Sequence, residues 1–125
     1  MDEKRRYQRF PCTIKMDFEY YEGDPDEIDT ETTVPIKGKG VILDMSIGGV
    51  FFVTNSRVGI NVPINLKFST KRQSYNIRGM VIRTGLLKNN PSEVAMRFAN
   101  TKAKGDSYIA VEFNTLIDGL NAGDM

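Results

Sequence analysis

The residues best suited to bind a charged ligand stand at the start of the chain, in the stretch EKRRYQRF, residues 3–10. After its first residue this arm carries only positive charge, on Lys4, Arg5, Arg6 and Arg9. The planar guanidinium of arginine presents parallel N–H donors that match the oxygens of a phosphate or carboxylate. Because the whole chain has a formal net charge of only +1, an electrostatic function must come from a local patch such as this arm.

A second group of small polar residues interrupts an apolar run at DMSIGG, residues 44–49. Asp44 and Ser46 are two positions apart, so in a strand they point to the same face. Gly48 and Gly49 follow, and they let the backbone turn or approach a ligand closely. The same residues could instead form a strand–turn–strand corner, with the polar side chains hydrogen-bonded to nearby backbone. Spacing alone favours the corner over a ligand site.

The sequence offers no catalytic set of residues. It has no histidine, which removes the commonest general base and the commonest metal ligand. A Ser-His-Asp arrangement and a zinc site of cysteine and histidine are therefore excluded, and no Walker-type phosphate loop is present. We expect a binding module and not an enzyme, with no catalytic residues, no metal and no cofactor.

Length and composition fit one globular domain in a reducing compartment. The chain has 125 residues, of which 40% are hydrophobic and 26% charged. The one cysteine, Cys12, excludes an intrachain disulfide, and its place on an apolar face predicts a core residue. The charged N-terminus does not look like a signal peptide, and no apolar run is long enough to span a bilayer. We therefore expect a cytoplasmic location without membrane insertion.

Apolar and polar residues alternate along most of the chain with a period of two, which indicates strands with one buried face. We expect strands over residues 12–21, 34–46, 49–54, 62–69, 74–87 and 92–100. The last segment changes to a helical spacing of apolar residues, at Ile109, Phe113, Leu116, Ile117 and Leu120. Six strands followed by one helix predict a mainly β fold, a small antiparallel barrel with a C-terminal helix packed on it.

An acidic stretch, EGDPDEIDTETT, lies between the first two expected strands at residues 22–33. Its only large apolar residue is Ile28, so its composition predicts an exposed loop. A calcium loop fits poorly, because Ile28 stands where a third oxygen ligand is needed and no glycine follows at the sharp turn.

Taken together, RRYQR and DMSIGG resemble the paired signature of the PilZ domain, which is RxxxR near the start and (D/N)xSxxG downstream. Both halves match without substitution, and the resemblance covers roughly residues 4–118. PilZ domains are six-stranded barrels with a C-terminal helix, as the strand pattern suggests. The resemblance implies a basic ligand-binding arm over residues 1–10 and a PilZ-like barrel with its helix over residues 11–120.

The resemblance also implies that the chain binds cyclic di-GMP, a bacterial second messenger. The implied binding residues are the motif positions and their neighbours Arg5, Arg6, Arg9, Asp44, Ser46, Gly48 and Gly49. The outer arginines would hold guanine edges and phosphates, since an arginine fork matches both. Asp44 and Ser46 would contact a guanine base, and Gly49 would keep the barrel surface clear. The stretch between the two motifs is longer than the family resemblance suggests, because of the acidic loop.

In the absence of ligand, we expect the arm to be loosely held, because its like charges repel and it has few apolar anchors. It would then fold over the ligand and the DMSIGG corner, and so change the surface that a protein partner contacts. The resemblance is to a stand-alone receptor, whose partner the sequence does not name. Motility, exopolysaccharide production and pilus function are outputs of the family, and the number of bound ligands and the oligomeric state are open.

Two other functions compete with this interpretation. A small-barrel nucleic-acid binder would use the basic arm with exposed aromatic residues such as Tyr7 and Phe10. The acidic loop and the lack of a broad basic surface argue against it, so we expect no nucleic-acid partner. The other is a pilus-assembly relative of PilZ that binds no nucleotide, although such relatives typically lack the motif residues that this chain keeps.

Overall fold

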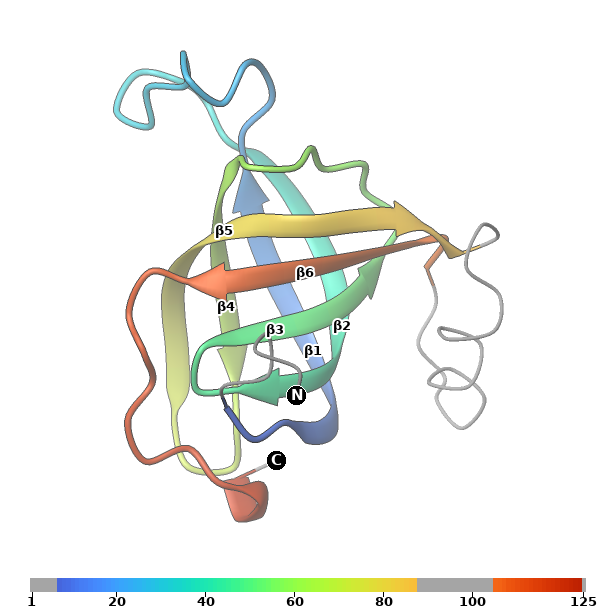
Figure 1. Ribbon diagram of the computed structural model, residues 1–125, viewed down its shortest axis with the longest axis vertical. Coiled ribbons are helices and arrows are strands. Elements are labelled where there is room, and N and C mark those ends of the chain that lie inside the picture. The colour runs from blue at the N-terminus through green and yellow to red at the C-terminus, as the bar shows by residue number, and fades with distance from the viewer. Residues whose placement is uncertain (1–6, 88–104, 125) are drawn as a thin grey trace.

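The computed structural model describes residues 7–87 and 105–124, and these ranges form an antiparallel β-barrel (Figure 1). Its strands are β1 Phe10–Tyr20, β2 Ile36–Ser46, β3 Gly49–Thr54, β4 Pro63–Ser69, β5 Ser74–Leu86 and β6 Ser107–Phe113. They close in the order β1-β2-β3-β6-β5-β4, and a 3₁₀ turn, η2 (Ala122–Asp124), follows β6. The prediction of a mainly β, six-stranded antiparallel barrel is confirmed for this part of the chain.

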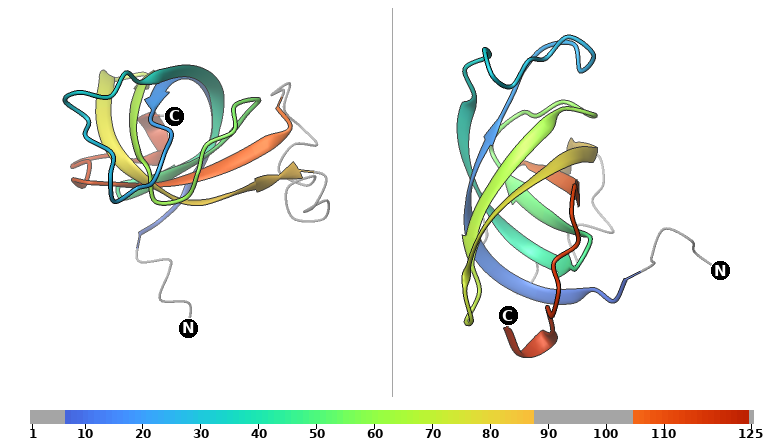
Figure 2. Two further views of the ribbon diagram at one scale, coloured as in Figure 1. Left: turned by 90° about the horizontal axis from the view of Figure 1, so that it is seen from above. Right: turned by 90° about the vertical axis from the view of Figure 1, so that its left-hand side faces the viewer.

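Alternation along the strands builds the barrel interior. Met16 and Phe18 of β1 point inward, as do Ile64, Leu66 and Phe68 of β4, and all five belong to one buried cluster. The strands enclose this cluster in a ring, which is seen from above in Figure 2. Full burial of such a side chain is worth about 1.5–3 kcal/mol relative to exposure, so the interior face of each strand drives closure of the barrel.

Strand β3 is buried on both faces, which explains why its sequence, GVFFVT, does not alternate. Phe52 lies in the barrel interior, whereas its neighbour Phe51 points to the opposite face. There Phe51 stacks on Tyr108 of β6, with ring centroids 5.6 Å apart. The second cluster on this face consists of Leu43, Phe51, Val53 and Ala110.

The prediction of a C-terminal helix is wrong for Ile109 and Phe113, and no α-helix is found in the rest of the described residues. Ile109 and Phe113 lie in β6, which pairs with β3 on one side and β5 on the other. Two residues four positions apart share a face in a strand as well as in a helix, so the spacing was ambiguous. No helix in the described ranges is long and apolar enough to span a membrane. The strand expected over residues 92–100 lies outside the described residues.

The acidic stretch between β1 and β2 is an exposed loop that projects beyond one end of the barrel, as predicted (Figure 1). Its shape is fixed by local hydrogen bonds. The carboxylate of Asp24 accepts from the backbone N–H of Asp26 at 3.0 Å, and that of Asp29 accepts from Glu31 at 3.0 Å. Ile28 packs against the barrel interior and anchors the loop.

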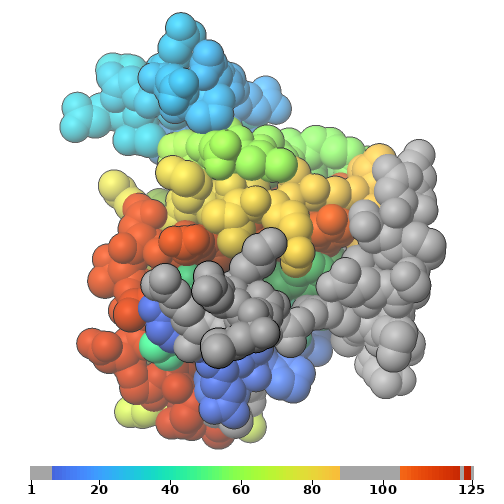
Figure 3. Space-filling view, in the orientation of Figure 1, coloured from blue at the N-terminus to red at the C-terminus, as the bar shows by residue number. Residues whose placement is uncertain are grey.

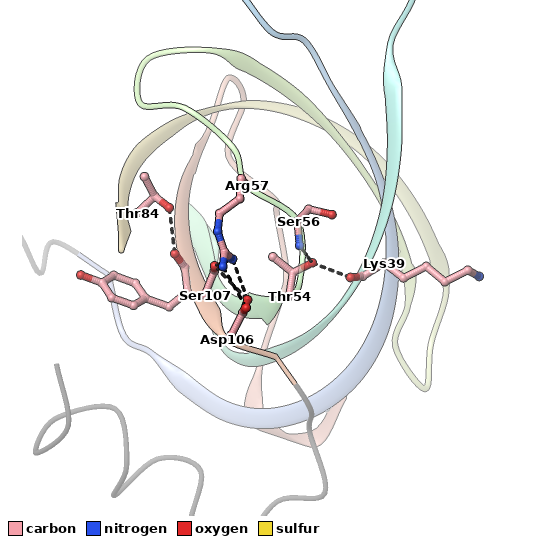
Figure 4. Close-up of polar contacts among 8 residues, drawn as sticks. Lys39, Thr54, Ser56, Arg57, Thr84, Asp106 and Ser107 are labelled. Carbon is pink, nitrogen blue, oxygen red and sulfur yellow. Dashed lines mark hydrogen bonds and ion pairs between the residues drawn. The ribbon is translucent and has the colours of Figure 1, made fainter. Parts of the chain in front are cut away.

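A polar network ties the end of β3 to the start of β6 (Figure 4). Both terminal nitrogens of Arg57 donate to the carboxylate of Asp106, at 2.6 and 2.8 Å, and Arg57 also donates to Ser107. The hydrogen bond from Arg57 lowers the pKa of Asp106 from 3.8 to about 2. Thr54 donates to the carbonyl of Lys39 at 2.7 Å and so links β3 to β2. These contacts hold the barrel end that lies away from the DMSIGG corner.

Candidate functional site

Pairing of β1 with β2 brings the two halves of the signature together. The register places Phe10 opposite Met45 and Pro11 opposite Asp44. Arg9, which directly precedes β1, donates from Nη1 to Oδ1 of Asp44 at 3.3 Å. The Arg9 side chain is 42% exposed and that of Asp44 is 12% exposed. A carboxylate just below the surface therefore holds a guanidinium that is still accessible from solvent.

A β-bulge turns Asp44 out of the barrel interior. Ile42 and Met45 both belong to the interior cluster although they are three positions apart. Regular alternation forbids that spacing, and the register of β2 against β3 shifts between Ile42 and Asp44. Leu43 joins the cluster on the opposite face, and Asp44 next to it pairs with Arg9. The bulge thus re-aims the carboxylate towards the arm.

Ser46 helps to build the tight hairpin between β2 and β3. Its hydroxyl accepts a hydrogen bond from the backbone N–H of Gly48 at 3.2 Å, and Ser46 pairs with Gly49 across the hairpin. Ser46 therefore forms the strand–turn–strand corner with a side-chain hydrogen bond to the backbone, which its spacing in the sequence favoured. Asp44 does not take part in that turn bond and pairs with Arg9 instead.

Gly48 makes room for an aromatic residue of the arm. A Cβ at this position would lie 2.8 Å from two carbons of the Tyr7 ring and 3.6 Å from Leu116. Real Cβ atoms do not approach other carbons at 2.8 Å, so the ring packs directly on the glycine backbone. Tyr7 and the segment after β6 thus meet at the hairpin tip, where the backbone N–H of Ile117 also donates to the carbonyl of Ile47 at 2.9 Å.

Gly49 has a different role from its neighbour. A Cβ there would lie 2.3 Å from the backbone carbonyl oxygen of Val111 in β6. Gly49 pairs with Glu112, and the carbonyl of Gly48 accepts from the N–H of Phe113 at 2.8 Å. The missing side chain lets β3 and β6 approach, so packing of the barrel alone is enough to require glycine at this position.

Cys12 lies on β1 near the pair of Arg9 and Asp44. It is half-buried against the interior cluster, in line with its prediction as a core residue. Burial first, and the negative charge of Asp44 second, raise the pKa of its thiol to about 12. A raised pKa favours the protonated thiol at neutral pH, and the protonated form is a poor nucleophile.

The family model of the PilZ domain matches residues 3–112. The chain belongs to the PilZ domain family. Its fold is similar to that of the inhibitor of motility MotI/DgrA from Bacillus subtilis, with a TM-score of 0.60 and 13% identity over 94% of this chain and 46% of that one. It is also similar to the PilZ domain of YcgR from Escherichia coli with c-di-GMP, with a TM-score of 0.52 and 10% identity over 90% and 79% of the two chains.

At 13% and 10% identity, these two structures show a shared fold but not a shared ligand or partner. The chain spans about half of the MotI/DgrA chain, with 46% of that chain covered. No curated protein matches. PilZ domains form a family of c-di-GMP receptors that are generally not enzymes.

Within the PilZ signature, the structure places Arg9, Asp44 and Ser46 around the β2–β3 hairpin, whereas Arg5 and Arg6 lie outside the described residues. Phe10, the last residue of the predicted arm, is instead the first residue of β1 and is 8% exposed. The described part of the arm therefore ends at Arg9. Burial of Phe10 also removes one of the two aromatic residues that a nucleic-acid binder would have used.

Two residues that lie against the signature residues were not predicted to do so. Tyr7 was considered only as an exposed stacking residue, and Leu116 only as part of a helix. The position of Tyr7 between two signature arginines is the one sequence signal that could have marked it. Leu116 carried no such signal, because its neighbours in space come from the arm and the hairpin, far away in the chain.

Proposed function

We propose that the chain binds c-di-GMP at the β2–β3 hairpin and does not hydrolyse it. The observation that carries this proposal is the contact of Arg9 with Asp44, which joins two signature halves that are 35 positions apart. The absence of histidine supports a receptor over a hydrolase. The proposal takes Arg5, Arg9, Asp44 and Ser46 as the ligand contacts.

The chemistry of the pair suits a guanine dinucleotide. Arg9 uses only Nη1 towards Asp44, so its other N–H donors can take a phosphate oxygen or the O6 and N7 atoms of guanine. The carboxylate of Asp44 can accept from the N1 and N2 donors of guanine. At 3.3 Å the pair is longer than the roughly 2.7–2.9 Å of a tight charge-assisted bond, so a ligand can insert its own contacts at little cost.

The signal would leave through the segment that follows β6. Tyr7 and Leu116 both lie against Gly48, and Leu116 is 46% exposed. A ligand that draws the arm over the hairpin would shift Tyr7 and with it the surface around Leu116. We propose that a protein partner contacts this surface, in the cytoplasm. MotI/DgrA is an inhibitor of motility, so a motility protein is the first partner to test in a pull-down with and without ligand.

The binding proposal is tested by calorimetry with c-di-GMP on the wild type and on Arg9→Lys. Lysine keeps the charge and loses the fork, so affinity should fall roughly ten- to a hundred-fold, which corresponds to about 1–3 kcal/mol. Arg57→Lys is the matched control, because Arg57 also pairs with an aspartate but lies at the other end of β3. Its affinity should equal that of the wild type.

Three results would count against the proposal. No heat above ligand dilution at micromolar protein would exclude binding, and equal loss in the two variants would point to a general charge effect. Linear dinucleotide after long incubation would show hydrolysis. A parallel titration with single-stranded oligonucleotide separates c-di-GMP from nucleic acid, and the fitted stoichiometry gives one or two ligands per chain.

A further inference from the structure

A groove of about 1320 Å³ lies away from the signature residues. Strands β1 and β2 form one side, and the β4–β5 hairpin forms the other. Its charged lining residues are Lys15, Lys39, Lys67, Lys71 and Asp17. None of the described signature residues lines it, so the groove is a separate surface from the proposed c-di-GMP site.

The groove is strongly basic although the chain as a whole is nearly neutral. Four ammonium groups face one carboxylate, that of Asp17. Lys39 donates to Asp17 at 3.1 Å, but the two side chains are 87% and 66% exposed, so solvent screens this pair. Lys67 lies opposite Asp17 on the neighbouring strand. The surplus of positive charge is therefore available to an acidic partner.

The groove also has an apolar component. Ile14 and Tyr75, which are half-buried, line it together with Phe68. The rings of Tyr75 and Phe68 stack with centroids 5.3 Å apart. All three side chains also belong to or pack against the interior cluster, so the match to an occupant rests on the basic lining, which suits carboxylates.

The acidic loop between β1 and β2 has that chemistry. Its exposed carboxylates belong to Glu22, Asp24, Asp26, Glu27, Asp29 and Glu31. No lysine or arginine occurs in the loop, and Val34 at its end is 84% exposed. The loop is held in shape by its own hydrogen bonds, so it would lose little conformational entropy on docking.

We propose that the acidic loop of one copy of this chain docks into the lysine groove of a second copy. The loop projects beyond one end of the barrel (Figures 1 and 3), whereas the β4–β5 hairpin, which carries Lys71, lies at the other end. Two different surfaces meet in such a contact, so it is heterologous and can repeat from copy to copy. Its attraction is mainly electrostatic, and salt weakens it.

Sedimentation velocity over a range of protein concentrations, without c-di-GMP, tests the docking. Wild-type protein should associate at about 50 mM salt, where the Debye length exceeds about 10 Å, and should be monomeric at about 1 M, where it is about 3 Å. The groove variant Lys67→Glu with Lys71→Glu should stay monomeric at low salt. Lys37→Glu is the matched control, because Lys37 lies on β2 outside the groove and should not alter association.

The loop variant combines Asp26→Asn, Glu27→Gln and Glu31→Gln. These side chains make none of the hydrogen bonds that shape the loop, so its fold should survive. Alone it should be monomeric. Mixed with the groove variant in equal amounts, it should form a one-to-one complex, because one chain keeps the groove and the other keeps the loop.

A wild type that is monomeric at low salt up to several hundred micromolar would overturn the proposal. So would association that survives in either variant, or a mixture that does not form the complex although both variants melt like the wild type. Binding of an oligonucleotide or of anionic vesicles that requires the groove lysines, with no self-association, would assign the groove to those partners instead. Each of these results is independent of whether c-di-GMP binds.

Discussion

Gly48 and Gly49 are adjacent in the signature, and the structure gives them opposite roles. In Gly49→Ala, the new Cβ would lie 2.3 Å from the carbonyl oxygen of Val111, a backbone atom in a paired strand. No side-chain rotation relieves this overlap, so β3 and β6 must separate. Overpacking of this kind costs about 1–3 kcal/mol. With roughly 3–6 °C per kcal/mol for a domain of this size, the Tm should fall by about 3–18 °C.

Gly48→Ala should show the reverse pattern. Its Cβ would meet the ring of Tyr7 at 2.8 Å, and a surface ring can move aside. Stability should therefore change by less than about 1 kcal/mol, as for most surface substitutions. The arm loses its anchor, however, and affinity for c-di-GMP should fall about tenfold, or about 1.4 kcal/mol. Tyr7→Phe is the control, because it keeps the ring and should keep the affinity.

Thermal melting and calorimetry on the same preparations decide between these roles. The argument is refuted if Gly49→Ala melts like the wild type but loses affinity, since Gly49 would then serve the ligand and not the barrel. It is equally refuted if Gly48→Ala binds c-di-GMP as tightly as the wild type, since the contact of Tyr7 would then be irrelevant to binding.

Acid should weaken the fold between about pH 4 and pH 2. Arg57 holds the folded-state pKa of Asp106 below its unfolded value. The stabilisation from this pair is therefore present above that pH range and is lost as the pH falls through it. Circular dichroism should show a flatter acid transition in Asp106→Asn, and an unchanged one would contradict the assignment. Thr54→Val should lower the free energy of unfolding in urea by about 1–3 kcal/mol, because a buried hydroxyl that both donates and accepts a hydrogen bond is lost. A smaller decrease would mean that other groups replace these two hydrogen bonds. Cys12 should react with iodoacetamide at about pH 8 far more slowly than after unfolding, because burial and then Asp44 raise its pKa; equal rates would contradict this.

Period-two patterns, together with a continuous apolar run for β3, were enough to predict β1 to β5 to within two residues at every boundary. They failed at β6, where Ile109 and Phe113 satisfy a helix and a strand equally well. The strand wins because it supplies the hydrogen bonds that close β3 onto β5. That closure is a contact between segments far apart in the chain, and the spacing of residues within one segment does not predict it.

The candidate site was predictable as a set of residues but not as a geometry. The two motifs named Arg9, Asp44 and Ser46, yet the bulge that turns Asp44 outward depends on how β2 fits against β3. The expectation that the arm is loosely held before ligand binds stays a prediction. Among its described residues, Tyr7 packs on Gly48 and Arg9 pairs with Asp44, so this end of the arm contacts the barrel.

A comparison of two Arg–Asp pairs on the barrel shows why arginine alone does not mark a binding site. Both terminal nitrogens of Arg57 donate to the carboxylate of Asp106, at 2.6 and 2.8 Å. A phosphate could bind Arg57 through these nitrogens only by displacing both hydrogen bonds. Arg9 gives one nitrogen to Asp44 at 3.3 Å and keeps its remaining donors. That single contact favours one direction of the Arg9 side chain. Because ordering a long side chain costs up to about 2 kcal/mol, a guanidinium held in this way binds an anion at a smaller entropic cost than a free surface arginine.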